Sequence, residues 1–224
     1  MTPPRQLVLP LPERVSLERD DYFVSASNRP ALEAVEAWPS WTGGMLAVIG
    51  PDGAGKSHLA GLHARRSGAV RWPAVGPHLV VEDADRVAGD RAAEEGLFHA
   101  FNRAAAEGGT ILFTARLPVA GWPVGLADLR TRLNTVVAAA LPPPDDALLF
   151  AVLLKLFADR QIDPERAAEV AAWLLPRMDR SLGEARRIVA ALDEASLAAK
   201  RRLDTRLAAE VLAGIARQED MNGR

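Results

Sequence analysis

Apolar residues follow two different patterns along this chain, and the change comes near residue 142. In the first part, short apolar runs are separated by segments in which apolar residues recur every three or four positions. The runs predict strands at 46–49, 69–72, 79–81, 110–114 and 135–141, and the amphipathic segments predict helices at 29–38, 57–66 and 92–106. Strands that alternate with helices favour an α/β fold, a parallel sheet with helices on both faces. We expect the runs 110–114 and 135–141 to be buried, and Asn28 to cap the first helix.

Only helical patterns follow the three prolines at 142–144. They predict helices at 147–159, 164–177, 182–192 and 205–217, of which the first is apolar on most of its surface and should be buried. We therefore expect an α/β domain over residues 16–141 and a small all-α lid domain over residues 142–224. Residues 1–15 hold four prolines and should form an extended tail.

The strongest motif directly follows the apolar run 46–49 and reads Gly-Pro-Asp-Gly-Ala-Gly-Lys-Ser over residues 50–57. This is the phosphate-loop pattern between a strand and a helix. Gly50, Gly53 and Gly55 allow left-handed or crowded backbone, so that N–H groups can converge on phosphate oxygens. Lys56 should reach the β- and γ-phosphates, and the Ser57 hydroxyl should bind Mg²⁺. Ala54 and His58 complete the expected nucleotide contacts; the alternative is an ordinary glycine-rich turn.

Acidic residues end the run 79–81. A strand that ends in carboxylates beside a phosphate loop can hold the metal and polarise an attacking water. We expect Glu82 to hold the metal indirectly, through a metal-bound water. We expect Asp83 to orient or polarise the attacking water. The alternative is a solvated acidic turn that caps the following helix.

The amino-acid composition further limits the classes of function that this chain can have. The 224 residues include 27 Lys and Arg against 29 Asp and Glu, a net charge of −2 that offers no general attraction to nucleic acid. With no cysteine, disulfides and thiolate metal sites are excluded, and the four histidines lack ligand spacing. No signal peptide and no membrane-spanning run are recognisable, so we expect a cytoplasmic protein without a membrane partner.

The order of these elements, together with Phe-Val-Ser-Ala-Ser-Asn-Arg at 23–29, resembles the AAA+ module of the bacterial replication initiator DnaA over residues 17–212. More narrowly, the chain is similar to the Hda family of DnaA-related regulators. The resemblance implies an AAA+ fold that binds ADP or ATP with Mg²⁺. It also implies that the chain promotes hydrolysis of DnaA-bound ATP and is at most a weak ATPase by itself.

A short peptide in the tail supports the narrower match. Residues 6–11 read Gln-Leu-Val-Leu-Pro-Leu and resemble the Q-L-x-L-P-L peptide by which Hda proteins bind the sliding clamp, the β subunit of DNA polymerase III. A proline-stiffened extended strand loses little entropy when it docks. The resemblance assigns clamp binding to Gln6, Leu7, Leu9, Pro10 and Leu11; a chance hexapeptide is the alternative.

Three further residues take roles from the same resemblance. Arg132, in Leu-Ala-Asp-Leu-Arg-Thr-Arg-Leu at 126–133, matches an arginine finger that reaches nucleotide held by a neighbouring subunit; otherwise it pairs with Asp128 on one helix face. Thr114 matches the sensor position at the end of a strand, although Ala115 and Arg116 depart from the usual Ser-Asp or Asn.

The second sensor pattern, G-x-x-R, is matched by Gly-Glu-Ala-Arg at 183–186 and assigns nucleotide contact to Arg186, with Arg187 as its rival. The connection 66–79 is too short for the extra strand and helix of the relatives, which affects a partner-packing surface.

Two other functions compete with this interpretation. One is an autonomous P-loop enzyme, either a helicase-loading ATPase or a small-molecule kinase. The other is a DNA-binding initiator fragment, which the acidic balance and the lack of an oligomerisation or helix-turn-helix module disfavour. We expect no direct sequence-specific DNA binding, and assembly into a homo-oligomer stays open.

Overall fold

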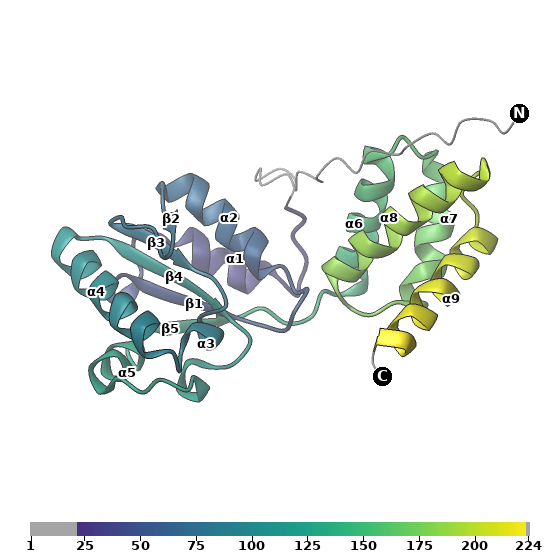
Figure 1. The fold of residues 1–224 in the computed structure, drawn as a ribbon. Helices are drawn as coiled ribbons and strands as arrows, with labels where there is room; N and C mark the ends of the chain where they lie inside the picture. The colour runs from purple at the N-terminus through teal and green to yellow at the C-terminus, as the bar shows by residue number, and fades with distance from the viewer. Residues whose placement is uncertain (1–21, 223–224) are drawn as a thin grey trace, which may run out of the picture.

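A computed structural model describes residues 22–222, in which a five-stranded sheet is followed by a bundle of helices (Figure 1). All four strand pairings are parallel and the spatial order is β2-β3-β4-β1-β5. The strands are β1 (Met45–Ile49), β2 (Val70–Arg71), β3 (His78–Val81), β4 (Thr110–Ala115) and β5 (Val137–Ala140). The parallel sheet and the approximate position of every predicted strand are confirmed.

Helices cover both faces of this sheet (Figure 1). On one face α1 (Arg29–Glu36) and α2 (Lys56–Ser67) pack over a core that includes Leu32 and Leu59. The other face is covered by α4 (Arg91–Glu107) and α5 (Ala127–Leu133), with the one-turn α3 (Ala84–Val87) at its margin. Single 3₁₀ turns lie at Thr42–Gly44 and Val119–Gly121.

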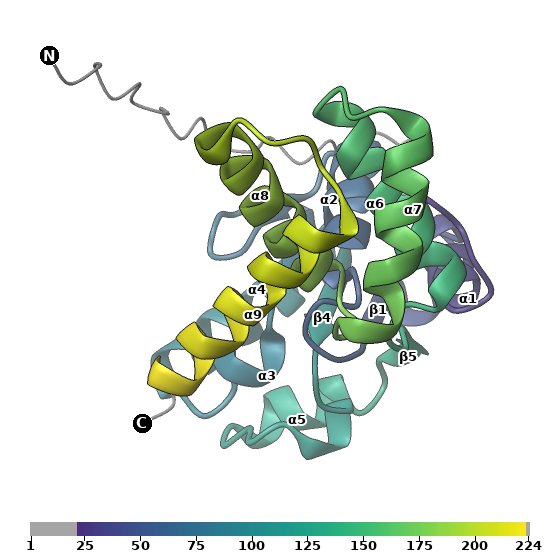
Figure 2. The same cartoon turned by 90° about the vertical axis from the view of Figure 1, so that its right-hand side faces the viewer.

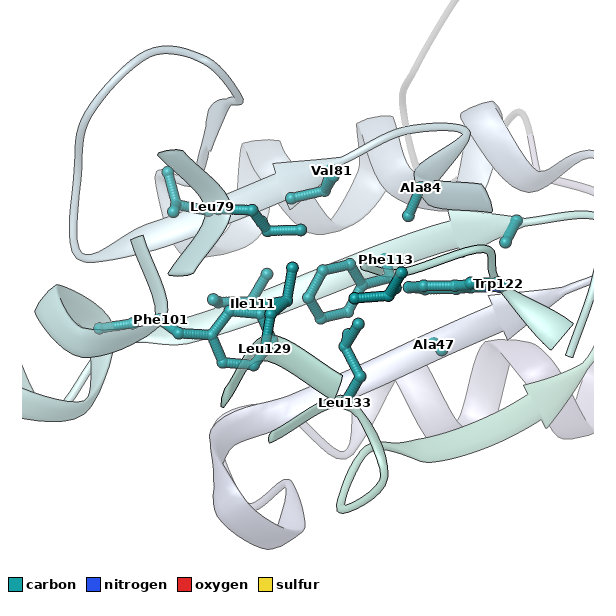
Figure 3. Packing of buried hydrophobic residues seen from close by; sticks show 14 residues of the cluster. Ala47, Leu79, Val81, Ala84, Phe101, Ile111, Phe113, Trp122, Leu129 and Leu133 are labelled. Carbon is teal, nitrogen blue, oxygen red and sulfur yellow. The ribbon is translucent and has the colours of Figure 1, made fainter. Parts of the chain in front are cut away.

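The second face is centred on Phe113 of β4 (Figure 3). Its ring centroid lies 5.6 Å from that of Phe101 on α4 and 5.9 Å from that of Trp122. All six residues of β4 are buried, because this inner strand is flanked by β3 and β1 and covered on both faces. That explains its continuous apolar run, since no position along it meets water.

The prediction that 135–141 is a buried strand is wrong for most of its length. The strand is β5, and three of its four residues are exposed; Val137 keeps 48% of its surface in water. Among the strands of residues 22–222 it is an edge strand that pairs with β1 alone. Its alanine side chains are too short to bury much apolar surface. Only Leu141, which follows the strand, is fully buried.

The lid consists of α6 (Asp146–Asp159), α7 (Pro164–Leu174), α8 (Leu182–Ala199) and α9 (Thr205–Asn222), with a 3₁₀ turn at Leu175–Arg177 (Figure 2). The side chains of Asp145, Asp163 and Ser181 accept hydrogen bonds from backbone N–H groups of the first turns of α6, α7 and α8. Such caps define where a helix begins. Leu153 and Phe157 of α6 are buried in the bundle core, as its apolar surface predicted.

The segment before α1 is tied to the start of the lid. Ser27 N–H donates to Asp145 Oδ2 at 3.2 Å, and Asp145 N–H donates to Ser27 Oγ at 3.3 Å. Burial alone would raise the pKa of Asp145, but hydrogen bonds from Leu148 N–H and from Ser25 and Ser27 hold it below its usual value. This carboxylate therefore joins the segment before α1 to the start of the lid, just after the prolines at 142–144.

Contrary to the prediction, the side chain of Asn28 does not cap α1. It occupies the N-cap position, but its backbone is already helical, and its side chain bonds backward to Ser25 N–H at 2.8 Å and to the Phe23 carbonyl at 2.8 Å. These bonds close a turn ahead of the helix. The tail peptide at 6–11 lies outside the described residues. Within 22–222, no helix has the length and apolar character needed to cross a bilayer.

Candidate functional site

The phosphate loop joins the end of β1 to the start of α2 at the carboxyl edge of the sheet, where α/β folds bind ligands. Gly53 and Gly55 have φ of +75° and +107°, the left-handed backbone that the sequence predicted. Within the described chain, no carbonyl accepts from the N–H groups of Gly53, Gly55, Lys56 and Ser57. Unbonded N–H groups at a helix N-terminus form a cradle for an anion.

Close packing explains two of the glycines. A Cβ on Gly50 would lie 2.0 Å from the Leu141 carbonyl oxygen, and one on Gly53 would lie 1.9 Å from Ser181 Oγ of the lid. Ala54, which follows Gly53, is buried in the core under α1 and α2. The loop is therefore held between the sheet and the lid.

Lys56 is turned into the loop itself. Its Nζ donates to the carbonyls of Gly50 at 2.8 Å and Pro51 at 2.9 Å, and lies 3.7 Å from Asp52 Oδ1. Only 6% of the residue is exposed. A buried ammonium needs such partners, and phosphate oxygens could replace them.

The next two residues, Ser57 and His58, differ in their surroundings. Ser57 is exposed, and its hydroxyl makes no hydrogen bond within residues 22–222. The His58 ring meets the buried Tyr22 ring edge-on, with centroids 5.2 Å apart. Ser57 is thus positioned to hold a cation, and His58 faces the segment that precedes α1.

Glu82 and Asp83 follow β3 directly, and each has a basic partner. Glu82 forms an ion pair with Arg71 of β2, whereas Asp83 Oδ2 lies 3.6 Å from Arg86 Nη1. Asp83 has a left-handed φ of +48° and stands at the N-cap position of α3, but its side chain makes no capping hydrogen bond. The alternative of a helix-capping acidic turn therefore does not describe Asp83.

Thr114 is buried near the end of β4, beside Val48 of β1. Its Oγ1 accepts a hydrogen bond from Asp83 N–H at 3.2 Å. The threonine thus holds the turn after β3 at the level of the phosphate loop, and the two residues predicted separately as catalytic are in direct contact.

Arg132 lies on α5, on the face of the sheet that α4 covers. Its Nη2 donates to Asn102 Oδ1 at 2.6 Å, and its guanidinium lies 5.4 Å from the centroid of Phe98. No ion pair with Asp128 forms within 22–222, so that alternative is not what the structure contains. Both partners belong to α4 and hold the guanidinium at a half-buried position.

The two candidate arginines of the second sensor differ clearly. Arg187 pairs with Glu184, one turn earlier on α8, with Nη2 2.8 Å from Oε2. Arg186 is half-buried and has no hydrogen bond or ion pair to any residue that the structure describes. Arg186 is therefore the arginine of the two that makes no polar contact with the described residues.

Sequence reasoning missed a group of charges beside the loop. Asp85, whose side chain is 1% exposed, accepts a hydrogen bond from Arg116 Nε at 3.3 Å. Arg116 Nη1 and Arg86 Nη2 lie 3.9 and 4.0 Å from Asp52 Oδ2. In the sequence, Arg116 stood out only because it departs from the usual residues of the first sensor pattern. Nothing there indicated that it would lie beside the phosphate loop.

A resident metal site built from protein alone is absent from the described part of the chain, where no three His, Asp or Glu side chains converge. The donors present nevertheless suit Mg²⁺ bound with a nucleotide, because such an ion takes only one or two protein ligands besides phosphate and water. Ser57 and, through water, Glu82 would hold it.

Comparison with solved structures places this fold. Domain III of the Thermotoga maritima replication initiation protein DnaA superposes with a TM-score of 0.69 over 87% of this chain and 95% of that one, at 17% identity. AMPPCP-bound DnaA from Aquifex aeolicus gives 0.62 over 76% of this chain and 63% of that one, at 16% identity. The Thermotoga maritima RuvB branch migration motor gives 0.57 over 82% and 65%, at 17% identity.

The fold is similar to that of DnaA domain III, a parallel α/β sheet followed by a helical lid. Residues 159–212 match the family profile described as Hda, lid domain. Both matches agree with the resemblance drawn from the motifs: the fold is similar to that of the DnaA structures, and the lid helices match the Hda lid profile.

Proposed function

We propose that this protein binds ADP or ATP with Mg²⁺ in the phosphate loop. Three features support this proposal: the unbonded N–H groups of the loop, the Lys56 side chain bonded to loop carbonyls that phosphate could replace, and the free hydroxyl of Ser57. The DnaA of Aquifex aeolicus was solved with AMPPCP in a similar fold. Glu82 would hold the metal through water, Asp83 would orient the attacking water, and Thr114 would sense the γ-phosphate while fixing Asp83. His58 and Tyr22 would border the nucleotide.

The biological role that we propose is regulation of replication initiation. The protein would bind the sliding clamp through Gln6, Leu7, Leu9, Pro10 and Leu11. It would promote hydrolysis of ATP bound to DnaA in the cytoplasm. The observation that carries this role is the Hda-type lid in direct contact with a phosphate loop. We also propose the division into tail, α/β domain and lid at residues 15 and 141.

Arg132 would act in trans in this scheme. Its guanidinium is oriented by Asn102 and Phe98, and it would neutralise γ-phosphate charge on the nucleotide of the neighbouring DnaA subunit. Arg186 would contact nucleotide in cis from the lid. The catalytic site is thus shared between two proteins.

A pull-down on purified sliding clamp tests whether the tail peptide binds the clamp. The double variant Gln6→Ala with Leu9→Ala should lose clamp binding and keep nucleotide binding, because the anchors are in the tail. Val8→Ala, at the variable position of the peptide, is the matched control and should bind the clamp normally. Equal clamp binding by the double variant and the parent would refute the role of the tail.

Hydrolysis rates separate this proposal from an autonomous P-loop ATPase such as a helicase loader. A regulator should turn over ATP slowly alone and should raise the hydrolysis rate of ATP-loaded DnaA when clamp on DNA is present. Appreciable turnover by the chain alone, unchanged by clamp or DnaA, would favour the autonomous enzyme.

A further inference from the structure

Three cationic side chains surround one carboxylate at the mouth of the phosphate loop. Asp52 Oδ1 lies 3.7 Å from Lys56 Nζ, and Asp52 Oδ2 lies 4.0 Å from Arg86 Nη2 and 3.9 Å from Arg116 Nη1. The three cations come from three different segments: the start of α2, α3, and the residues after β4. Asp52 belongs to the loop itself, and its side chain is 68% exposed.

The contacts with Asp52 are loose, whereas Arg116 is also bonded to a buried carboxylate. Ion pairs at 3.7–4.0 Å to an exposed carboxylate contribute little stability. Arg116, by contrast, is oriented by the buried Asp85, and Arg86 also has Asp83 at 3.6 Å. Asp52 can therefore move away while Arg116 keeps its bond to Asp85 and Arg86 keeps its ion pair with Asp83.

This arrangement suits an anion with several oxygens. The carboxylate of Asp52 lies beside the Nζ of Lys56, the group that would meet the terminal phosphates, so Arg86 and Arg116 border the same space. Guanidinium groups form charge-assisted hydrogen bonds to phosphate, and fixed ones lose little entropy in doing so. A terminal phosphate carries more charge and more acceptor atoms than Asp52.

We infer that Arg86 and Arg116 contact the terminal phosphate of a nucleoside triphosphate bound to the same chain, and that Asp52 takes its place when that phosphate is missing. The inference rests on the proposed nucleotide binding and adds how the site distinguishes triphosphate from diphosphate. Asp52 then opposes triphosphate in two ways, by occupying the arginines and by repelling like charge. ADP, which lacks the terminal phosphate, does not need the arginines.

Calorimetric titration of the full chain with ADP and with AMPPCP, both with Mg²⁺, tests the inference. Arg86→Ala should weaken AMPPCP binding by about tenfold, the loss of one charged hydrogen bond, and leave ADP binding within about twofold. Asp52→Asn should tighten AMPPCP binding several-fold more than ADP binding. Arg91→Ala, which removes an exposed arginine paired with Glu95, is the matched control and should change neither.

Arg116→Gln should behave like Arg86→Ala, but it also leaves Asp85 without its cation and can unfold the site. Arg86→Ala and Asp52→Asn alter exposed side chains and decide the matter independently of folding. If both variants change ADP and AMPPCP affinity alike, or change neither, the arginines are structural and the inference is overturned. A parent chain that binds neither nucleotide overturns the proposed function as well.

Discussion

The amide of Leu182 at the start of α8 donates a hydrogen bond to the carbonyl of Gly53 in the phosphate loop, at 2.8 Å. Leu182 is buried at this junction with Leu148 and Leu149 of α6. A rigid lid element is thus bonded directly to the loop that would hold phosphate. A change in the loop when nucleotide binds therefore reaches the lid through one main-chain contact.

This junction predicts an unequal effect of alanine at two glycines with similar backbone. Gly53 and Gly68 have φ of +75° and +71°, but a Cβ on Gly53 meets Ser181 Oγ at 1.9 Å, whereas one on Gly68 meets nothing within 4 Å. Gly68→Ala should cost only the left-handed backbone penalty, about 1 kcal/mol. Gly53→Ala should cost more and should increase hydrogen exchange at the Leu182 amide. Equal losses of unfolding free energy in both variants would contradict a tight loop–lid contact.

A buried carboxylate fixes the approach to the helix that carries Arg132. Glu94 of α4 is 2% exposed and accepts hydrogen bonds from the N–H groups of Gly89, Gly125 and Leu126 at 2.7–3.0 Å. Burial opposes ionisation, yet these N–H groups together lower the pKa of Glu94 below its ordinary value of 4.5. Its contribution to stability is therefore present above about pH 4.5 and is lost as pH falls through the lower folded-state pKa.

We expect Glu94→Gln to reduce the free energy of unfolding at pH 7 by about 1–3 kcal/mol, because the amide cannot accept at both ends. Glu95→Gln, at an exposed neighbouring position paired with Arg91, should change it by less than about 0.5 kcal/mol. Urea unfolding measures both variants. A normal stability for Glu94→Gln would show that the loop before α5 is held by other contacts.

His63 makes the free energy of unfolding depend on pH in a second range, between about pH 4 and pH 6.5. It is 2% exposed between Trp38 and Trp41, and burial, with smaller effects of His78 and Arg66, lowers its pKa from 6.5 to about 4. Between these values the unfolded chain binds the proton and the folded chain does not. Stability therefore falls as pH is lowered from 6.5 toward 4, and this loss is complete below the folded-state pKa.

From pH 7 to pH 5 the histidine should remove about 2 kcal/mol of unfolding free energy. His63→Gln should flatten that part of the profile, while His99→Gln, at an exposed position, should leave it as in the parent. Urea unfolding at each pH measures the effect. An unchanged slope in His63→Gln would mean that other groups cause it.

Arg132→Ala should reduce stimulation of DnaA-bound ATP hydrolysis on the order of 1,000-fold, while nucleotide and clamp binding are retained. Arg130→Ala is the control on the same helix, since its guanidinium bonds instead to the Val124 carbonyl. Single-turnover hydrolysis by ATP-loaded DnaA measures both. Unchanged stimulation by Arg132→Ala would remove this residue from the mechanism.

Much of the fold follows from local pattern. The phosphate loop is set by fixed spacing of glycines, lysine and serine, and the strands and helices by periodicity, because these depend on neighbours in sequence. The exposed edge strand β5 was mistaken for a buried one, since apolar residues alone do not say whether a strand has one neighbour or two. Asn28 was mistaken for a cap because its side chain bonds equally well to the preceding turn.

The sequence by itself determined the parallel α/β architecture, the helical lid and the phosphate loop between β1 and α2. Only the tertiary structure decided which charges meet. Asp52, Arg86 and Arg116 come together because β3 and β4 end at the same edge of the sheet as β1, although the residues are up to 64 positions apart (116 − 52). Such contacts depend on distance in space, which residue spacing along a chain does not encode.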